Sequence, residues 1–164
     1  MGWVLFDWGD TLMVDFPEYD GPMATWPRVQ AVSGAREALQ QLRHEGWRTA
    51  LATNAADSEE PEIRAALTRA GLGDLIDQVY CSRRVGHSKP SPEFFAFIIR
   101  DLGVDASELV MVGDNFTADI EGALRAGIRA VWLRGGSDKP SEGPGWRSIG
   151  SLAQLSGLLA TWSP

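Results

Sequence analysis

The sequence predicts an α/β fold with three layers, in which a doubly wound, Rossmann-like parallel sheet of about five strands carries helices on both faces. Two observations predict this class. Short β-rich apolar runs alternate with amphipathic helical segments along the chain, which is typical of a covered parallel sheet. Glycine also follows directly after the expected ends of four helices, where a left-handed C-cap favours it: Gly46, Gly71, Gly103 and Gly127.

The expected elements follow one another in a regular order. The expected strands cover residues 4–6, 48–52, 78–81, 109–112 and 130–133. The expected helices cover residues 35–45, 61–70, 92–102, 118–126 and 151–159. Neither an internal repeat nor a low-complexity segment interrupts them. A length of 164 residues suits one domain, so we expect a single domain over residues 1–164.

Composition narrows the class of protein. A net charge of −7 and a pI near 4.8 make nucleic acid or an anionic membrane an unlikely partner, because both require clustered Lys and Arg. Cys81 is the only cysteine, so neither an internal disulfide nor a cysteine-based metal site can form. The first residues lack a basic segment, and no apolar stretch is long enough to span a bilayer. We therefore expect a cytoplasmic protein.

The segment WVLFDWGDTL is the most informative part of the chain. Its apolar run ends at Asp7 and turns into a loop that contains a glycine. Ligands of open α/β sheets bind outside the carboxyl ends of the strands, which is where this carboxylate would lie. Taken alone, Asp7 could equally cap the following turn. Three later segments repeat the pattern of an apolar strand or helix entry beside polar residues: TALATN, GHSKPSPEFF and LVMVGDNFTAD.

In this order, the four segments resemble the four motifs of the haloacid dehalogenase-like hydrolase superfamily, most of whose members are phosphatases that use an aspartate nucleophile and Mg²⁺. The resemblance extends from Trp3 to Leu133. It implies a central first strand flanked by the second and fourth strands, so that Asp7 and Asp114 end adjacent strands. It also implies that Asp7 attacks phosphorus and forms an aspartyl-phosphate that water then hydrolyses.

The resemblance further implies a metal site and a phosphate site. The Asp7 carboxylate, the Gly9 carbonyl and Asp114 would bind Mg²⁺, which prefers oxygen ligands, and Asp119 would support them. Alternatively, Asp119 is simply an acidic residue favoured at a helix N-terminus.

The second and third motifs would bind phosphate. Thr53 and Asn54, which end the second strand, would bind phosphate oxygens, although Thr-Asn by itself is more often a turn. The ammonium of Lys89 would pair with Asp7 and the phosphate, and Thr11 would orient the first loop.

The first motif departs from the family pattern. Phosphatases of this type usually read D-x-D-G-T, whereas this chain reads Asp7-Trp8-Gly9-Asp10-Thr11. The residue two positions after the nucleophile normally protonates the leaving oxygen and activates water. Gly9 keeps the carbonyl but has no acid, which would lower catalysis by about 10²–10⁴. Asp10 would replace the acid if its side chain reached the leaving group, or it would instead bond the loop backbone.

The chain also leaves little room for a cap domain. Residues 13–33 are too few to fold as one, so we expect a short ordered loop in its place and a resemblance to the capless members. An uncovered site would admit a phosphorylated small molecule or macromolecule, or a second copy of the chain would supply a lid. Trp8, Trp26 and Trp146 are expected in loops facing the site, a partner or local packing. Arg134 or Lys139 could contact the substrate, although a solvated loop is the simpler interpretation.

The sequence thus favours a Mg²⁺-dependent phosphatase. Two alternatives remain open. A dehalogenase-like hydrolase of carbon–halogen bonds would use Asp7 without a metal, and it would tolerate Gly9. A non-enzymatic module would keep affinity for phosphate or Mg²⁺ without turnover.

Overall fold

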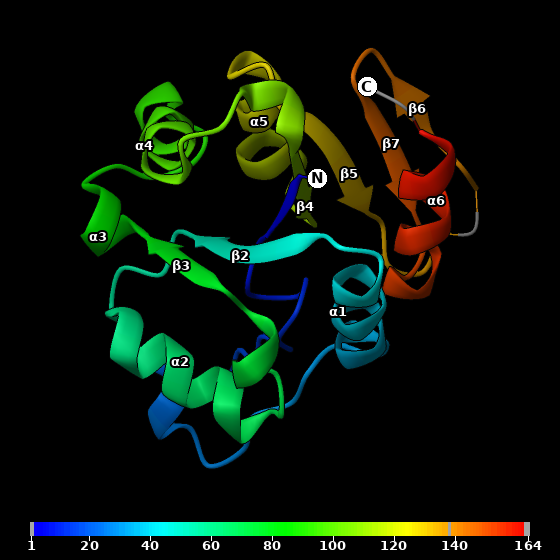
Figure 1. Ribbon diagram of the computed structural model, residues 1–164. Helices are drawn as coiled ribbons and strands as arrows, with labels where there is room; N and C mark the ends of the chain where they lie inside the picture. Colours follow the sequence, from blue (N-terminus) through cyan, green and yellow to red (C-terminus); the bar gives the residue numbers. More distant parts are fainter. Residues whose placement is uncertain (1, 138, 163–164) are drawn as a thin grey trace.

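The protein is an α/β structure built on one seven-stranded sheet (Figure 1). The computed structural model describes residues 2–137 and 139–162. The strand order is β3-β2-β1-β4-β5-β7-β6, and every neighbouring pair is parallel except β6 and β7. The predicted fold class is therefore confirmed, and the first strand lies between the second and fourth as expected.

The strands are β1 (Trp3–Phe6), β2 (Arg48–Thr53), β3 (Gln78–Cys81), β4 (Leu109–Gly113), β5 (Arg129–Leu133), β6 (Glu142–Gly143) and β7 (Trp146–Ile149). The helices are α1 (Ala35–His44), α2 (Glu60–Arg69), α3 (Ser82–Val85), α4 (Pro92–Leu102), α5 (Gly122–Arg125) and α6 (Leu155–Thr161). Short 3₁₀ helices are η1 (Met23–Thr25), η2 (Gly73–Leu75), η3 (Ala106–Glu108) and η5 (Leu152–Gln154), and η4 (Phe116–Glu121) is π-helical.

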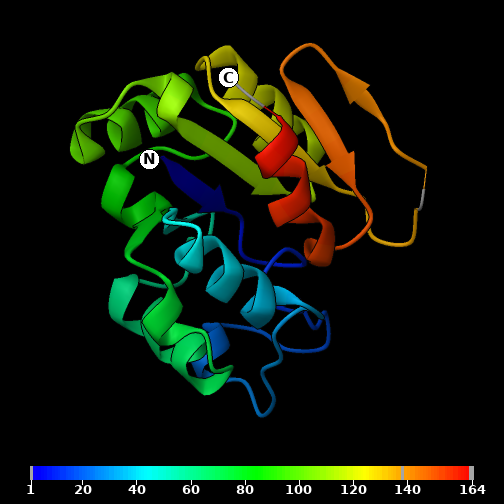
Figure 2. The same cartoon turned by 45° about the vertical axis from the view of Figure 1, so that its right-hand side comes forward.

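Two apolar cores cover the two faces of the sheet. Along β1, Val4 and Phe6 belong to one core and Trp3 and Leu5 to the other, as the two-residue period of a strand requires. The first core contains the apolar faces of α1, α2 and α6, and the second contains those of α4 and α5. Figures 1 and 2 show α4 and α5 on the opposite side of the sheet from α1 and α2. Burying each large apolar side chain contributes about 1.5–3 kcal/mol, so these two cores hold the strands rigidly in register.

The register brings the ends of three strands to one edge of the sheet. Phe6 is paired with Leu51 of β2 and with Val112 of β4. The chain continues from β1 with Asp7, whose backbone N–H donates to the Val112 carbonyl at 2.9 Å. The residues that follow β1, β2 and β4 therefore meet at this edge.

The expected number of strands was too low. The structure adds β6 and β7 beyond β5, and Trp146 lies in β7 rather than in a loop. Only Ile149 of β7 is buried, so the segment lacks an apolar pattern, and the main-chain pairing with Ala130–Leu133 of β5 makes it a strand. The short helix α3 was also not expected. The expected helix 118–126 begins earlier, as η4, and the last helix ends at Thr161.

The connection between β1 and α1 is an ordered loop. Within residues 13–33, the described elements are η1 and a bridge between Met13 and Ala31. Trp26 packs against the rings of Phe16 and Tyr19, and local packing was one of the three placements expected for it. The interpretation of this loop as the replacement for a cap stays a prediction.

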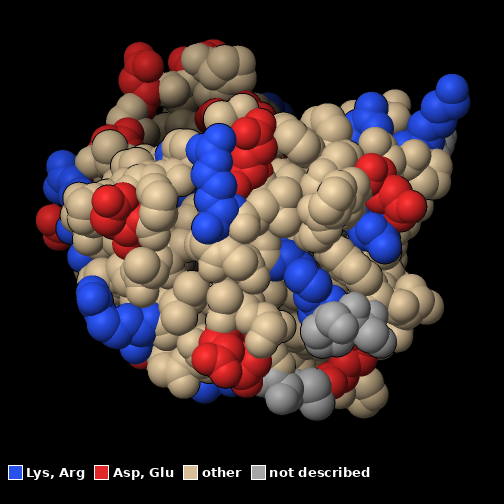
Figure 3. Space-filling view, turned by 90° about the horizontal axis from the view of Figure 1, so that it is seen from above, with Lys and Arg blue, Asp and Glu red and all other residues tan. Residues whose placement is uncertain are grey.

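The surface carries mixed charge on the face seen from above in Figure 3, where Lys and Arg side chains are scattered among Asp and Glu. Several of the exposed cations form ion pairs, such as Arg125 with Glu121 and Arg147 with Glu142. None of the described helices has the length and apolar character that crossing a membrane requires.

Candidate active site

A buried lysine joins two carboxylates at the edge of the sheet. Lys89 lies between α3 and α4, and its side chain is only 2% exposed. Its Nζ donates to Asp7 Oδ1 at 2.8 Å and to Asp119 Oδ1 at 2.6 Å. Burial by itself lowers the pKa of Lys89, but the two carboxylates outweigh it and raise that pKa above its usual value. The lysine is therefore a fixed positive charge beside Asp7.

Asn54 holds the backbone of this lysine. Its Oδ1 accepts from the Lys89 N–H at 2.8 Å, and its Nδ2 donates to the Lys89 carbonyl at 2.9 Å. Asn54 directly follows β2, so this pair of bonds ties the Lys89 loop to the carboxyl edge of the sheet. The Asn54 amide is thus already bonded within the protein, whereas it was predicted to contact phosphate.

Three carboxylates meet around Asp7. One oxygen each of Asp7, Asp114 and Asp119 lie within 4.8 Å of one another. The Thr11 hydroxyl lies 3.4 Å from both Asp7 Oδ2 and Asp114 Oδ1, so it lies between the two carboxylates; its role in orienting the loop stays a prediction. Burial, then the hydrogen bond and negative charge of Asp7, raise the pKa of Asp114 to about 7. Burial also raises the pKa of Asp119, against the opposing effect of Lys89. The cluster thus holds excess negative charge.

The close approach of Asp119 depends on Gly113. Asp119 lies on η4, and its Oδ2 accepts from the Asn115 N–H at 3.1 Å. A β-carbon added at Gly113 would lie only 2.1 Å from that Oδ2. Glycine at the end of β4 therefore makes room for the carboxylate, which Lys89 and the Asn115 amide then hold in place.

The residues present fit a divalent cation. Three carboxylates and one ammonium carry a formal charge of −2, and carboxylate oxygens suit hard cations. Their spread of up to 4.8 Å is close to the roughly 4.2 Å between opposite oxygens around Mg²⁺. Both oxygens of Asp119 accept hydrogen bonds, at 2.6 and 3.1 Å, whereas the contacts of Asp7 Oδ2 and Asp114 Oδ1 with the Thr11 hydroxyl are longer, at 3.4 Å. Asp7 and Asp114 would therefore be the ligands, and Asp119 would support them.

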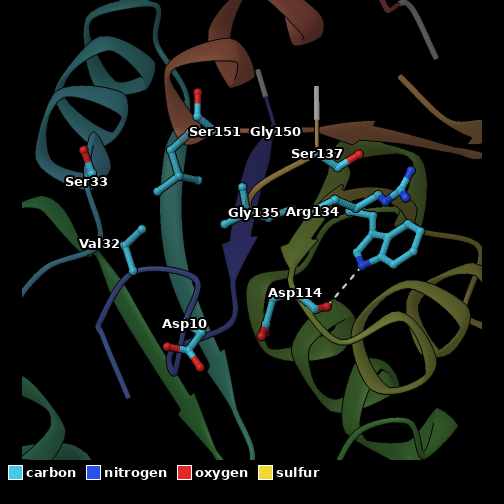
Figure 4. A pocket seen from close by; sticks show the side chains of 12 residues that line it. Asp10, Val32, Ser33, Asp114, Arg134, Gly135, Ser137, Gly150 and Ser151 are labelled. Carbon is cyan, nitrogen blue, oxygen red and sulfur yellow. Dashed lines mark hydrogen bonds between the residues drawn. The ribbon is translucent and has the colours of Figure 1, made fainter. Parts of the chain in front are cut away.

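The Asp10 carboxylate bonds the loop backbone. Asp10 has a left-handed conformation with φ of 58°, and its Oδ1 accepts from the Asp15 N–H at 3.0 Å. Asp10 borders a cavity of about 620 Å³ together with Asp114 and Arg134. In Figure 4, Asp10 and Asp114 lie at one end of this cavity, and Gly150 and Ser151 lie at the other. Of the two orientations that the sequence allowed for Asp10, the structure has the one bonded to the loop.

A second cavity, of about 330 Å³, opens beside Asp7. It is lined from the first loop and from the end of β2, and its lining includes Asp7, Gly9, Asp15, Thr53 and Asn54. Thr53 Oγ1 accepts from the Ala55 N–H at 3.1 Å. Trp8 and Trp26 also line this cavity, with side chains that are almost fully buried.

Asp15 was not among the predicted site residues. It lies outside every motif, and only the turn of the loop back toward Asp7 brings it to the cavity. The one local signal is the Asp10 side chain, which is of a type that commonly bonds nearby backbone in turns.

Arg134 and Lys139, which were considered as substrate contacts, border different cavities. Arg134 borders the larger cavity, whereas Lys139 borders a separate cavity near Pro140. The Trp132 indole donates to the Asp114 carbonyl at 3.1 Å, which fixes the start of the loop after β4 (Figure 4). Trp146 packs against Trp132 and Phe116.

Comparisons with known proteins identify the family. The family model of haloacid dehalogenase-like hydrolases matches residues 7–127. The phosphoserine phosphatase of Thermus thermophilus is 36% identical over 124 residues, which are 74% of this chain and 48% of that protein. The glyceraldehyde 3-phosphate phosphatase of Pyrococcus abyssi is 33% identical over 108 residues, which are 66% of this chain and 44% of that protein. The chain thus spans about half the length of these curated relatives.

A solved structure matches over almost the whole length. An uncharacterized protein of Listeria monocytogenes serotype 4b has a TM-score of 0.85 and 33% identity, and the match covers 98% of this chain and 97% of that one. The motif carboxylates that meet at the sheet edge, the matching family model and this full-length likeness agree. The chain belongs to the haloacid dehalogenase-like hydrolase family.

Proposed function

We propose that the protein hydrolyses phosphomonoesters with Mg²⁺ through an aspartyl-phosphate on Asp7. The observation that carries the proposal is the position of Asp7, whose one oxygen is bonded by Lys89 while the other lies near Thr11 and Asp114. Family membership and the phosphatase names of relatives support the same reaction class.

In the proposed first step, a carboxylate oxygen of Asp7 forms a bond to phosphorus while the bond from phosphorus to the leaving oxygen breaks. Lys89 holds one carboxylate oxygen of Asp7 and leaves the other, which lies 3.4 Å from the Thr11 hydroxyl, for the attack; the charge of Lys89 also attracts the phosphoryl group. In the second step, water attacks phosphorus and the carboxylate of Asp7 is released. Thr53, at the end of β2, would donate its hydroxyl to a phosphate oxygen.

Mg²⁺ would be held by Asp7, Asp114 and the Gly9 carbonyl with support from Asp119, and when bound it supplies charge neutralisation for the phosphoryl oxygens. The negative charge of the three carboxylates supports this proposal. Without a cation, the same charge would repel a phosphate dianion, and Lys89 alone compensates one unit of it.

We further propose that the substrate is a phosphorylated small molecule or macromolecule other than nucleic acid. We also propose that the protein is cytoplasmic. The short loop of residues 13–33 supports an uncapped site within a single domain, and a second copy of the chain could serve as its lid.

The test is hydrolysis of para-nitrophenyl phosphate with Mg²⁺ and with EDTA, beside Asp7→Asn, which keeps the shape but removes the nucleophile. We expect turnover that requires Mg²⁺ and that Asp7→Asn abolishes. Acid quenching with radiolabelled substrate should leave label on the wild-type protein and none on Asp7→Asn.

Two other results would replace the proposal. Halide release from a 2-haloacid in EDTA would indicate a metal-independent dehalogenase. Phosphate-dependent thermal stabilisation without any turnover would indicate a binding module.

A further inference from the structure

We propose that Asp15 supplies the general acid and base that Gly9 cannot. This inference rests on the proposed phosphatase function and names a residue that lies outside the four motifs. The cavity beside Asp7 is bordered by both Gly9 and Asp15, so a substrate whose phosphorus faces Asp7 lies next to the Asp15 carboxyl group.

Asp15 borders the space that a side chain at position 9 would occupy. A β-carbon added at Gly9 would lie 3.6 Å from the Asp15 β-carbon, 3.8 Å from its carboxyl carbon and 3.7 Å from Oδ2. A side chain at position 9 would therefore extend directly against the Asp15 carboxyl group. The glycine leaves this space open, and a carboxyl group from elsewhere in the loop borders it.

The loop holds Asp15 at this position through its neighbours. Its backbone N–H donates to the Asp10 carboxylate at 3.0 Å, and the preceding N–H, of Val14, donates to the Gln30 carbonyl at 2.8 Å. The next residue, Phe16, is 8% exposed and packs against Trp26. These contacts fix the Asp15 backbone on both sides, while the residue itself is exposed and borders the cavity.

This arrangement gives Asp10 a positioning role. The Asp10 carboxylate accepts from the Asp15 amide, and Asp10 itself borders the larger cavity rather than the one beside Asp7. The exchanged order of glycine and aspartate in the first motif thus has two structural results: Gly9 leaves space beside Asp7, and Asp10 bonds the segment that carries Asp15.

Asp15 would move one proton in each of the two steps. As the bond from Asp7 to phosphorus forms, the protonated carboxyl group of Asp15 gives its proton to the leaving alkoxide, which departs as an alcohol. The Asp15 carboxylate then takes a proton from the water that attacks the aspartyl-phosphate. Inorganic phosphate leaves, and both carboxyl groups return to their initial states.

The test compares Asp15→Asn with Asp10→Asn and Asp57→Asn. Asn at position 10 can still accept from the Asp15 amide and tolerates a positive φ, so this variant removes only the acidity of Asp10. Asp57 borders the same cavity as Asp15 and serves as the matched carboxylate control. Each variant is assayed with an alkyl phosphate, whose leaving group needs a proton, and with 2,4-dinitrophenyl phosphate, whose leaving group does not.

We expect Asp15→Asn to lose about 10²–10⁴ in the rate of alkyl phosphate hydrolysis. Asp10→Asn should lose less, because it only weakens the bond that positions Asp15, and Asp57→Asn should keep the wild-type rate. With dinitrophenyl phosphate, it should release a burst of dinitrophenol and accumulate labelled phosphoprotein, because the second step has lost its base. In the Asp15→Asn background, Gly9→Asp should restore alkyl phosphate hydrolysis in part, since it returns a carboxyl group to the same space.

The outcomes separate this inference from the proposed function. If the wild type fails to hydrolyse either substrate, the proposed function fails. If the wild type is active and Asp15→Asn matches it with both substrates, the inference about Asp15 is wrong while the phosphatase remains. A burst in Asp10→Asn or Asp57→Asn, without one in Asp15→Asn, would assign the acid to that residue. A merely structural role for Asp15 would slow both substrates equally, without phosphoprotein, and would also overturn the inference.

Discussion

Replacing Gly113 by Ala should destabilise the protein through Asp119. The added β-carbon would lie 2.1 Å from Asp119 Oδ2, 2.3 Å from its carboxyl carbon and 2.5 Å from its β-carbon. Ordinary contacts require more than 3 Å, so the carboxylate must move by about 1 Å or more. That movement weakens its bonds to Lys89 Nζ and to the Asn115 N–H, and Asp119 is only 1% exposed.

The expected loss follows from these contacts. Overpacking costs about 1–3 kcal/mol and a hydrogen bond to a charged group is worth about 1.5–3 kcal/mol, so the free energy of unfolding should fall by about 3–5 kcal/mol. For a domain of this size, that corresponds to a decrease in Tm of about 6–20 °C. Urea denaturation in EDTA measures the change without any contribution from bound cation.

Gly157→Ala is the matched control. Gly157 lies within α6, is exposed, and has no neighbour within 4 Å of an added β-carbon. Ala there should stabilise the protein by about 0.5–1 kcal/mol, because it lowers the entropy lost when the helix folds. The two glycine substitutions should therefore have opposite signs. A Gly113→Ala protein as stable as the wild type, with Gly157→Ala behaving as expected, would refute the packing argument at Asp119.

Three further predictions concern side chains near the sheet. Lys89→Met should lower the free energy of unfolding in EDTA by about 3–5 kcal/mol, because it leaves two carboxylates without their buried partner; equal midpoints in urea would contradict this. Asn54→Ala should lower the free energy of unfolding by about 1–3 kcal/mol, because both hydrogen bonds to the Lys89 backbone are lost. Asn54→Asp keeps the acceptor for the Lys89 N–H and should lose only part of that free energy. Equal losses in the two variants would argue against this. Burial, together with its hydrogen bond to the Asp101 carboxylate, raises the pKa of Tyr80 well above 10, so the folded state binds this proton more tightly than the unfolded state does. The free energy of unfolding should therefore decline as pH rises above about 10. Denaturation at pH 8 and pH 11 should show a smaller decline in Tyr80→Phe than in the wild type.

Local sequence determined the layered fold and the position of most motif residues. An apolar run followed by Asp7, and another followed by Gly113 and Asp114, is enough to predict two buried parallel strands with carboxylates at their ends. Because the ends of parallel strands meet at one edge, the meeting of Asp7 and Asp114 followed from the predicted strand order, which the structure confirmed. Strand periodicity is a short-range property that a sequence carries directly, whereas the order of the strands was implied by the resemblance to the family.

Only the tertiary structure decided three other features. β7 became a strand because it pairs with β5, although its own side chains carry little apolar pattern. The Asp10 carboxylate bonds the Asp15 amide, and the Asp10 backbone is left-handed. A bridge between Met13 and Ala31 closes the loop that follows.

Asp15 reached the cavity beside Asp7 because that loop folds back on itself, and the only local signal was the neighbouring Asp10, of a type that bonds nearby backbone in turns. The order of residues in the first motif determined which acid was missing, whereas the folded loop decided which carboxyl group borders the space that Gly9 leaves open. Loop geometry is set by bonds between residues distant in the sequence, such as Val14 with Gln30, and short-range patterns carry no information about such bonds.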